Sequence, residues 1–215
     1  MKGLFRTLSI LTVLLTLISQ TATAEMQPVV DIPKQWNKFV DDLVSLNEQL
    51  IKSTLHRESW RVGGYSNEPR FFDEVTYTNE QTNEVTSVIQ WERRDPSAIH
   101  SIEINLRDKQ GRLTKDFSAS YLTKHRNAPI QTLITIHYYN KNLHGFRVFD
   151  ASKTRIYDVC RGTYKGKKVN IDLDDDYGEL SEALENKKGI MSTAAYKACF
   201  GGRHPDITRL NIPTL

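Results

Sequence analysis

Two histidines, His137 and His144, have a spacing that would let their side chains share a proton or a metal ion. Between them, Asn140 and Lys141 are typical of a two-residue turn that joins two antiparallel strands. Such a turn places the two imidazoles directly opposite each other, with Cβ atoms ~5 Å apart. The alternative is that both are ordinary sheet histidines, because no third metal ligand stands close by in the sequence.

Three further side chains are candidates for ligand binding. Tyr139 and Arg147 lie near the histidines, and we expect them to line a polar groove at the same place. Trp91 opens the charged run 91–95, and a second basic run covers 124–127. Basic groups beside aromatic strands suit a carboxylate, a phosphate or a glycan. The alternative is that both runs are solvated strand ends.

An acidic run near the C-terminus is rich in the oxygen ligands that calcium prefers. Its register does not fit an EF-hand, because Tyr177 stands at the glycine position and Ala183 at the bidentate glutamate position. A calcium loop of another kind is one interpretation, and a solvated turn before a helix N-terminus is the other. Calcium is a possible cofactor at this run, and no motif requires any cofactor. The candidate metal ligands are Asp172, Asp174, Asp176 and Glu179.

Signals for hydrolytic chemistry are weak. Glu92 and Glu103 fall on strands that we expect to be neighbours, so they could form the carboxylate pair that glycosidases need. Ser118 and Ser120 lack a nucleophile-elbow motif, so the sequence does not support a serine hydrolase.

The first 24 residues have the three parts of a secretory signal peptide. Lys2 and Arg6 precede an uncharged apolar run over 8–18, and Ala22 and Ala24 are the small residues of a cleavage site. The run is about half of the ~20 residues that a membrane-spanning helix needs. We therefore expect cleavage after Ala24 and a mature chain in the periplasm or outside the cell, without a transmembrane segment.

The cysteines and the net charge restrict the function further. Cys160 and Cys199 are the only cysteines, and they lie too far apart for a C-x-x-C motif, so we expect a structural disulfide between them. Loss of the leader removes two basic residues and no acidic one, which lowers the formal net charge from +3 to +1. Nucleic-acid binding is not expected, because it needs an excess of Lys and Arg.

The periodicity of apolar residues divides the chain into four segments. We expect the signal peptide over 1–24, an N-terminal helix within 25–61, an antiparallel β-meander over 62–173, and an acidic loop with short helices over 174–215. The helix begins at the cap Asp31, continues to about Arg57, and has an apolar stripe that is typical of packing on a sheet. A coiled-coil or membrane-surface helix is the alternative. The stripe consists of Trp36, Phe39, Leu43, Leu46 and Leu50.

The fold class that follows is α+β and mainly β. Glycines at 63–64 break the helical pattern, and short turns such as 94–97 separate the strands, which favours an antiparallel meander over parallel crossovers. The sheet is either open with the helix packed on it, or curled into a partial barrel that the helix caps. Seven strands are predicted, over 71–78, 85–92, 99–107, 113–121, 130–139, 143–150 and 155–164.

These features favour an exported, non-catalytic binding or accessory protein. Its groove, between sheet and helix, would take a protein or a small ligand of the cell envelope. The alternatives are an envelope protein that binds calcium or a transition metal, and an envelope glycan hydrolase.

Overall fold

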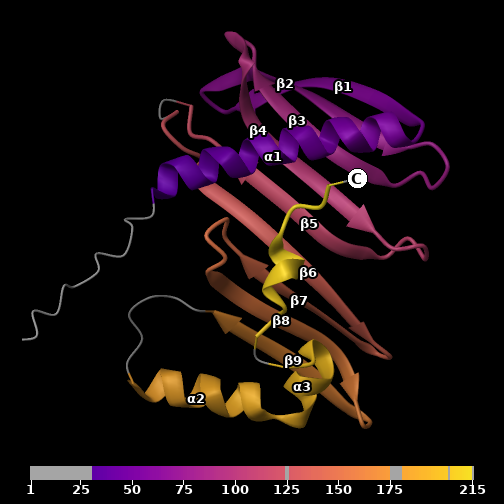
Figure 1. Ribbon diagram of the computed structural model, residues 1–215, viewed down its shortest axis with the longest axis vertical. Coiled ribbons are helices and arrows are strands. Elements are labelled where there is room, and N and C mark those ends of the chain that lie inside the picture. The colour runs from indigo at the N-terminus through magenta and orange to yellow at the C-terminus, as the bar shows by residue number, and fades with distance from the viewer. Residues whose placement is uncertain (1–30, 124–125, 175–180, 203, 215) are drawn as a thin grey trace, which may run out of the picture. The chain divides into compact units, whose positions relative to one another are not determined.

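The computed structural model describes residues 31–123, 126–174, 181–202 and 204–214, and the chain from Asp31 onward forms one compact unit. The expected leader over 1–24 lies outside the described residues. Nine antiparallel strands form one sheet in which sequence neighbours are also neighbours in space (Figure 1), which confirms the mainly β meander. Among the described residues, the first and the last strand form the two edges of this sheet. The strands are β1 His56–Tyr65, β2 Glu68–Asn79, β3 Val85–Glu92, β4 Asp95–Arg107, β5 Leu113–Ser120, β6 Gln131–Asn140, β7 Leu143–Phe149, β8 Arg155–Tyr164 and β9 Lys167–Asp174.

Helix α1, Ile32–Ser53, begins at the predicted cap. The Asp31 carboxylate accepts a hydrogen bond from the backbone N of Lys34 at 3.1 Å. Pro33 lies in the first turn, where a missing N–H costs no helical hydrogen bond. The predicted stripe packs on the sheet and forms one core with the central strands. Its buried members are Phe39, Leu43 and Leu46, with Trp36 and Leu50 partly buried at the ends.

The prediction that the helix continues to Arg57 is wrong, because β1 begins at His56 and pairs with β2. This strand is an edge with mostly exposed side chains, so its sequence lacks the alternation that marks the others. Gly63 and Gly64, predicted as a break, lie inside the strand at a shift in register. A Cβ at Gly64 would clash with the carbonyl oxygen of Glu68, which explains the glycine.

β4 begins earlier than predicted. Glu92 pairs with Asp95, which leaves Arg93 and Arg94 as the turn, so Asp95 belongs to the strand and not to a turn over 94–97. The register then shifts at Trp91, which absorbs the extra residues of β4 as a bulge.

β9 is absent from the seven predicted strands, although its sequence contains a signal for it. Val169, Ile171 and Leu173 alternate with polar residues, and Lys165 and Gly166 have the positive φ values of a hairpin turn. The strand pairs with β8 along its whole length.

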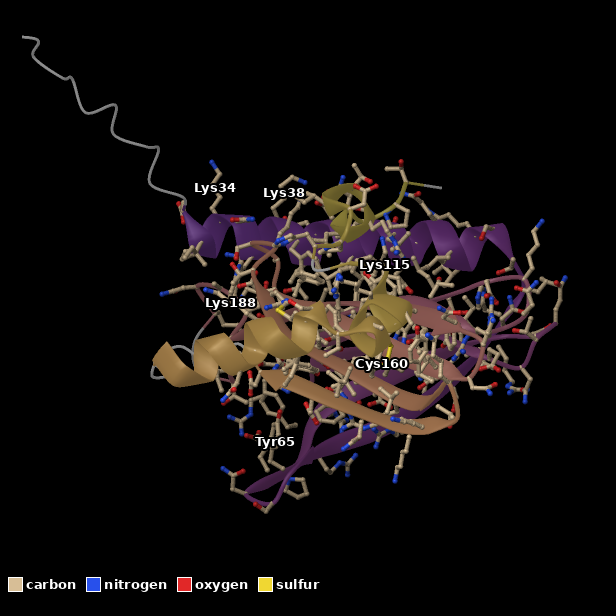
Figure 2. The ribbon with its side chains drawn as sticks, turned by 90° about the horizontal axis from the view of Figure 1, so that it is seen from below. Lys34, Lys38, Tyr65, Lys115, Cys160 and Lys188 are labelled. Atoms are coloured by element: carbon tan, nitrogen blue, oxygen red, sulfur yellow. A yellow bond between two sulfur atoms is a disulfide. The ribbon has the colours of Figure 1, made fainter. Side chains whose placement is uncertain are left out.

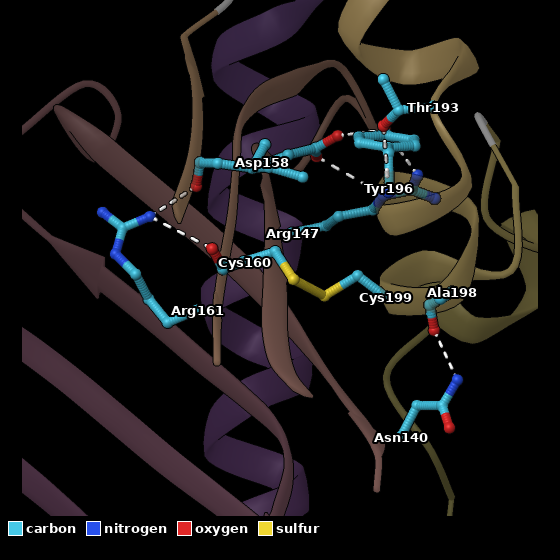
Figure 3. The surroundings of a disulfide bond; sticks show 10 residues. Asn140, Arg147, Asp158, Cys160, Arg161, Thr193, Tyr196, Ala198 and Cys199 are labelled. Carbon is cyan, nitrogen blue, oxygen red and sulfur yellow. Dashed lines mark hydrogen bonds and ion pairs between the residues drawn. A yellow bond between two sulfur atoms is a disulfide. The ribbon is translucent and has the colours of Figure 1, made fainter. Parts of the chain in front are cut away.

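Three short helices follow the sheet: α2 Ser181–Ser192, α3 Ala194–Phe200 and the 3-10 helix η1 Ile207–Leu210. α3 ends at Gly201, whose φ of 74° is left-handed, a conformation that glycine adopts without strain. Cys160 of β8 and Cys199 of α3 form the predicted disulfide (Figure 3). Gly145 lies below this bond, and a Cβ there would collide with the Sγ of Cys199. Within the described residues, no helix is both long and apolar enough to cross a membrane.

The helices α1 and α3 lie over the same face of the sheet, which we call the covered face (Figure 1). α1 packs on β4 and its neighbours, whereas α3 packs on β6, β7 and β8. Figure 2 shows α1 along this side of the sheet, with Lys34 and Lys38 pointing away from the strands. Because side chains alternate along a strand, every second residue faces the opposite, open face.

A buried histidine at one end of the sheet gives the fold a pH-dependent stability. His100 stacks on Phe72 and contacts Phe71 edge to face, and its Nε2 forms a hydrogen bond with the hydroxyl of Tyr65. Burial lowers the pKa of His100. The unfolded chain therefore binds a proton more readily, and the free energy of unfolding should decrease as the pH falls below about 6.5, until the folded pKa is passed.

Urea unfolding between pH 5 and pH 7.5 tests this prediction. His100→Phe should reduce the loss of stability on acidification, whereas His56→Gln, a histidine at the start of β1, should retain it. An unchanged loss in His100→Phe would show that other groups cause it.

Candidate ligand-binding sites

The two histidines of the sequence analysis meet on the open face. β6 and β7 pair Tyr139 with His144 and His137 with Phe146, so the prediction that the imidazoles lie directly opposite is wrong. The turn lies one residue later than predicted, at Lys141 and Asn142. The histidines are diagonal neighbours instead, and His137 Nδ1 lies 3.1 Å from His144 Nε2.

Asp116 of β5, which was not among the predicted site residues, completes this cluster. Its Oδ2 lies 2.8 Å from His137 Nε2. Asp116 pairs with Thr135, which is two residues before His137 on β6. Asp116 and His137 are therefore diagonal neighbours across β5 and β6, as His137 and His144 are across β6 and β7. An ionised carboxylate fixes the proton on Nε2 of His137, which leaves Nδ1 to accept a hydrogen bond from His144. Burial, followed by the neighbouring His137, lowers the pKa of His144.

Tyr139 joins the histidines as expected. Its ring stacks on the ring of His144 with centroids 4.6 Å apart and planes within 1° of parallel. Arg112 lies over the Tyr139 ring, 4.9 Å from the centroid, and its charge is paired with Asp108 at 2.7 Å.

Arg147 and Trp91 do not join this cluster. Arg147 is three residues from His144 on β7, so alternation turns it to the covered face, where its side chain is fully buried. Trp91 also faces the covered side and stacks on the exposed Trp60 of β1, with centroids 6.0 Å apart. The prediction that Arg147 lines one groove with the histidines is therefore wrong.

Arg147 belongs to a buried polar cluster between the sheet and α3 (Figure 3). Its Nη2 donates to the hydroxyl of Tyr196 at 2.7 Å and to the carbonyl of Gly202, and its Nε lies 3.4 Å from Asp158 Oδ1. The Tyr196 hydroxyl donates to Asp158 Oδ2 at 2.5 Å. Burial and the Asp158 carboxylate raise the pKa of Tyr196 strongly. The side chains of Arg147 and Asp158 have no exposed surface, so we assign the cluster to stability.

Only part of the predicted calcium loop can be located. Asp172 and Asp174 end β9 on the open face, and Asp172 is paired with Arg161 at 2.9 Å. Asp176 and Glu179 lie outside the described residues. In the part of the chain that the structure describes, no three His, Cys, Asp or Glu side chains converge as metal ligands.

The carboxylates considered for glycan hydrolysis are not neighbours. Glu103 lies opposite Val88, and Val88 is four residues from Glu92 along β3. At the rise of a β-strand, this offset separates the two glutamates by about 13 Å along the strand direction. Glycosidase carboxyl groups are roughly 5 to 9.5 Å apart. Glu92 is also buried and forms an ion pair with Arg126. This pair does not provide a glycosidase site.

A pocket lies on the covered face, where β7, the β7–β8 turn, α2 and the C-terminal segment 204–210 meet. We call it the C-terminal pocket. Its volume is about 590 Å³. Its apolar lining is formed by Phe149, Met191, Pro205, Ile207 and Leu210.

The remaining side chains of the C-terminal pocket are all basic groups: Lys153, Arg155, Lys187, Lys188 and His204. No carboxylate is found among its described lining residues. Lys153 donates to the amide oxygen of Asn211 at 2.9 Å, Arg155 lies 3.4 Å from Asp158, and Lys187 donates to a backbone carbonyl. Lys153 is exposed, so its ammonium group can reach a ligand at the mouth.

A second pocket, of about 470 Å³, adjoins the first and shares Lys153 and Leu210 with it. It is lined by one side of α1 and by residues 210–214. The buried Leu210 thus separates two spaces that lie beneath the C-terminal segment. No sequence signal marks them, because their walls come from four segments that are distant along the chain.

The fold and these sites define a mainly β protein with an open nine-stranded meander, a pocket of ligand size on the covered face and a histidine cluster on the open face. Comparison with known proteins finds no matching family model, curated protein or solved structure.

Proposed function

We propose that this chain is an exported, non-catalytic binding protein that holds an elongated apolar molecule with an anionic head in the C-terminal pocket. One observation carries the proposal: the pocket combines an apolar floor with a rim that contains basic groups and no described carboxylate. Such a combination matches an amphiphile, such as a long-chain carboxylate or a phosphate monoester.

The dimensions and the floor suit the apolar part of such a ligand. Small-molecule sites commonly have volumes of about 300 to 1,000 Å³ and apolar walls with a few polar groups that fix the orientation. Phe149, Met191 and Leu210 are buried and form a firm floor. Ile207, by contrast, is 63 % exposed at the mouth. Covering such a side chain with ligand removes apolar surface from water, at roughly 25 cal/mol per Å².

The rim suits the anionic head. Lys153 lines both pockets and is exposed, so its ammonium group can reach an anionic head in either one. Its hydrogen bond to the Asn211 amide is a weak competitor for a carboxylate or phosphate, because charge-assisted bonds are about twice as strong as neutral ones.

Export is part of the proposal. An intramolecular disulfide fits an oxidising compartment, and the first 24 residues have the composition of a cleavable leader. Mass spectrometry of the protein recovered from the periplasm tests this part, since cleavage after Ala24 and oxidation of Cys160 and Cys199 each change the mass by a defined amount.

Binding is tested with a dansyl-labelled fatty acid, whose fluorescence rises when it enters an apolar site. Laurate and dodecyl phosphate should displace the probe from the mature, oxidised protein, and neutral dodecanol should do so at least roughly tenfold less well, a difference of about 1.4 kcal/mol. The two anionic competitors distinguish a carboxylate head from a phosphate head.

Two variants locate the site. Met191→Trp fills the floor and should weaken all three competitors, whereas Lys153→Glu should weaken only the two anions, by roughly three- to tenfold. Lys197→Glu is the matched control, because Lys197 is an exposed residue of α3 that does not line the pocket. Absence of saturable binding, or equal displacement by dodecanol and laurate, would overturn the proposal.

A further inference from the structure

We propose that His137 and His144 form a binding site for a late first-row divalent transition-metal ion, Zn²⁺, Ni²⁺ or Cu²⁺, on the open face of the sheet. The site is independent of the C-terminal pocket, which lies on the covered face. The two imidazole nitrogens are the ligands, Asp116 orients one of them, and water fills the remaining positions.

The separation of the two nitrogens fits a shared ion. His137 Nδ1 and His144 Nε2 are 3.1 Å apart. With metal–nitrogen bonds of about 2.0 to 2.1 Å, adjacent ligands are separated by roughly 2.9 Å at a right angle and roughly 3.4 Å at the tetrahedral angle. The observed separation lies between these values, so a small rotation of the exposed His144 ring is enough to admit an ion.

Asp116 provides the second interaction that metal-binding histidines usually have. Its carboxylate, 2.8 Å from His137 Nε2, keeps the proton on that nitrogen and leaves the lone pair of Nδ1 directed at His144. Because Asp116 lies on the far side of the imidazole, it orients the ligand and does not itself bind the ion.

The surroundings hold the ligands in place and leave one side open. Both histidines are on paired strands, and the Tyr139 ring lies flat against His144. The His137 side chain is only 11 % exposed, whereas His144 is exposed to solvent. Imidazole ligands select Zn²⁺, Ni²⁺ and Cu²⁺ over Ca²⁺ and Mg²⁺, which prefer oxygen.

The proton of the hydrogen bond between the two imidazole rings must move to another nitrogen when an ion binds. In the metal-free cluster, Nε2–H of His144 donates to Nδ1 of His137, as the Asp116 contact requires. Binding of an ion moves this proton to Nδ1 of His144, through solvent. Each ring keeps one proton, and the Asp116 carboxylate still accepts a hydrogen bond from Nε2 of His137.

Calorimetric titration of the untagged, oxidised protein with ZnCl₂ and CuCl₂ tests the site, because a His-tag would bind the same ions. We expect one saturable site per chain. His144→Gln should abolish it, and Asp116→Asn should weaken it by roughly 10- to 100-fold without removing it. His56→Gln is the matched control, because His56 lies on β1 outside the cluster, and it should leave the affinity unchanged.

A second readout separates the site from adventitious binding. Electron paramagnetic resonance of the Cu²⁺ complex should show coupling to two imidazole nitrogens, and His144→Gln should remove this signal while thermal unfolding of the variant stays close to that of the parent protein. Binding that survives in His144→Gln, or that is lost equally in His56→Gln, would overturn the proposal.

Discussion

Replacement of Arg147 by methionine should lower the free energy of unfolding by about 3 to 5 kcal/mol, because it leaves a buried carboxylate without the cation that is buried beside it. Arg147 and Asp158 have no exposed side-chain surface. Methionine fills a similar volume, but it has no hydrogen-bond donor. The Tyr196 hydroxyl and the Gly202 carbonyl, which both accept from Arg147, therefore lose this donor. Urea denaturation followed by circular dichroism measures the effect.

The double variant Arg147→Met, Asp158→Leu separates the two sources of this loss. Removal of both charges eliminates the buried carboxylate that Arg147 compensates, and well-packed apolar replacements of buried ion pairs are often neutral or stabilising. The double variant should therefore recover much of the stability lost in Arg147→Met. If Arg147→Met costs less than about 1 kcal/mol, the value typical of a solvent-exposed pair, the cluster does not stabilise α3 in the way that we describe.

The sheet was largely predictable because its pairings are local. In a meander each strand pairs with its sequence neighbours, so alternation and short turns indicate the topology without any long-range information. β1 escaped prediction because an edge strand with exposed side chains, such as Trp60 and Val62, has no buried face to impose alternation. The end of the helix was predicted too late because β1 was not recognised. This strand begins after only two residues, Thr54 and Leu55, beyond the end of α1.

The sites were less predictable, because they depend on register and on distant segments. The β6–β7 turn lies one residue later than predicted, which makes His137 and His144 diagonal neighbours and not directly opposite residues. Their side chains still contact each other. The same hypothesis failed for Arg147, because three residues along a strand reverse the face. Asp116 is 21 residues from His137 and could be found only from the β5–β6 pairing.

α3 lies in the chain between the two segments that line the C-terminal pocket, α2 and 204–210, and the disulfide ties α3 to β8. Cys160 and Cys199 are 39 residues apart in sequence. In the chain-entropy description, closing a loop of this length in the unfolded chain stabilises the fold by about 4 kcal/mol. The variant Cys160→Ala, Cys199→Ala should lose this amount, which corresponds to a melting temperature lower by roughly 8 to 16 °C for a chain of this size.

Differential scanning calorimetry with and without reductant measures this prediction and provides its control, because reductant should destabilise the parent protein and leave the double alanine variant unchanged. Hydrogen exchange adds a local test. The Arg147 cluster and the packing of Phe200 remain in the alanine variant, so α3 should stay folded on the sheet under native conditions and the dansyl-labelled fatty acid should still bind at 25 °C. Loss of protection confined to α3, with the sheet as stable as before, would contradict the entropic account. It would show instead that the disulfide acts as a local clamp, and probe binding would then be lost together with α3.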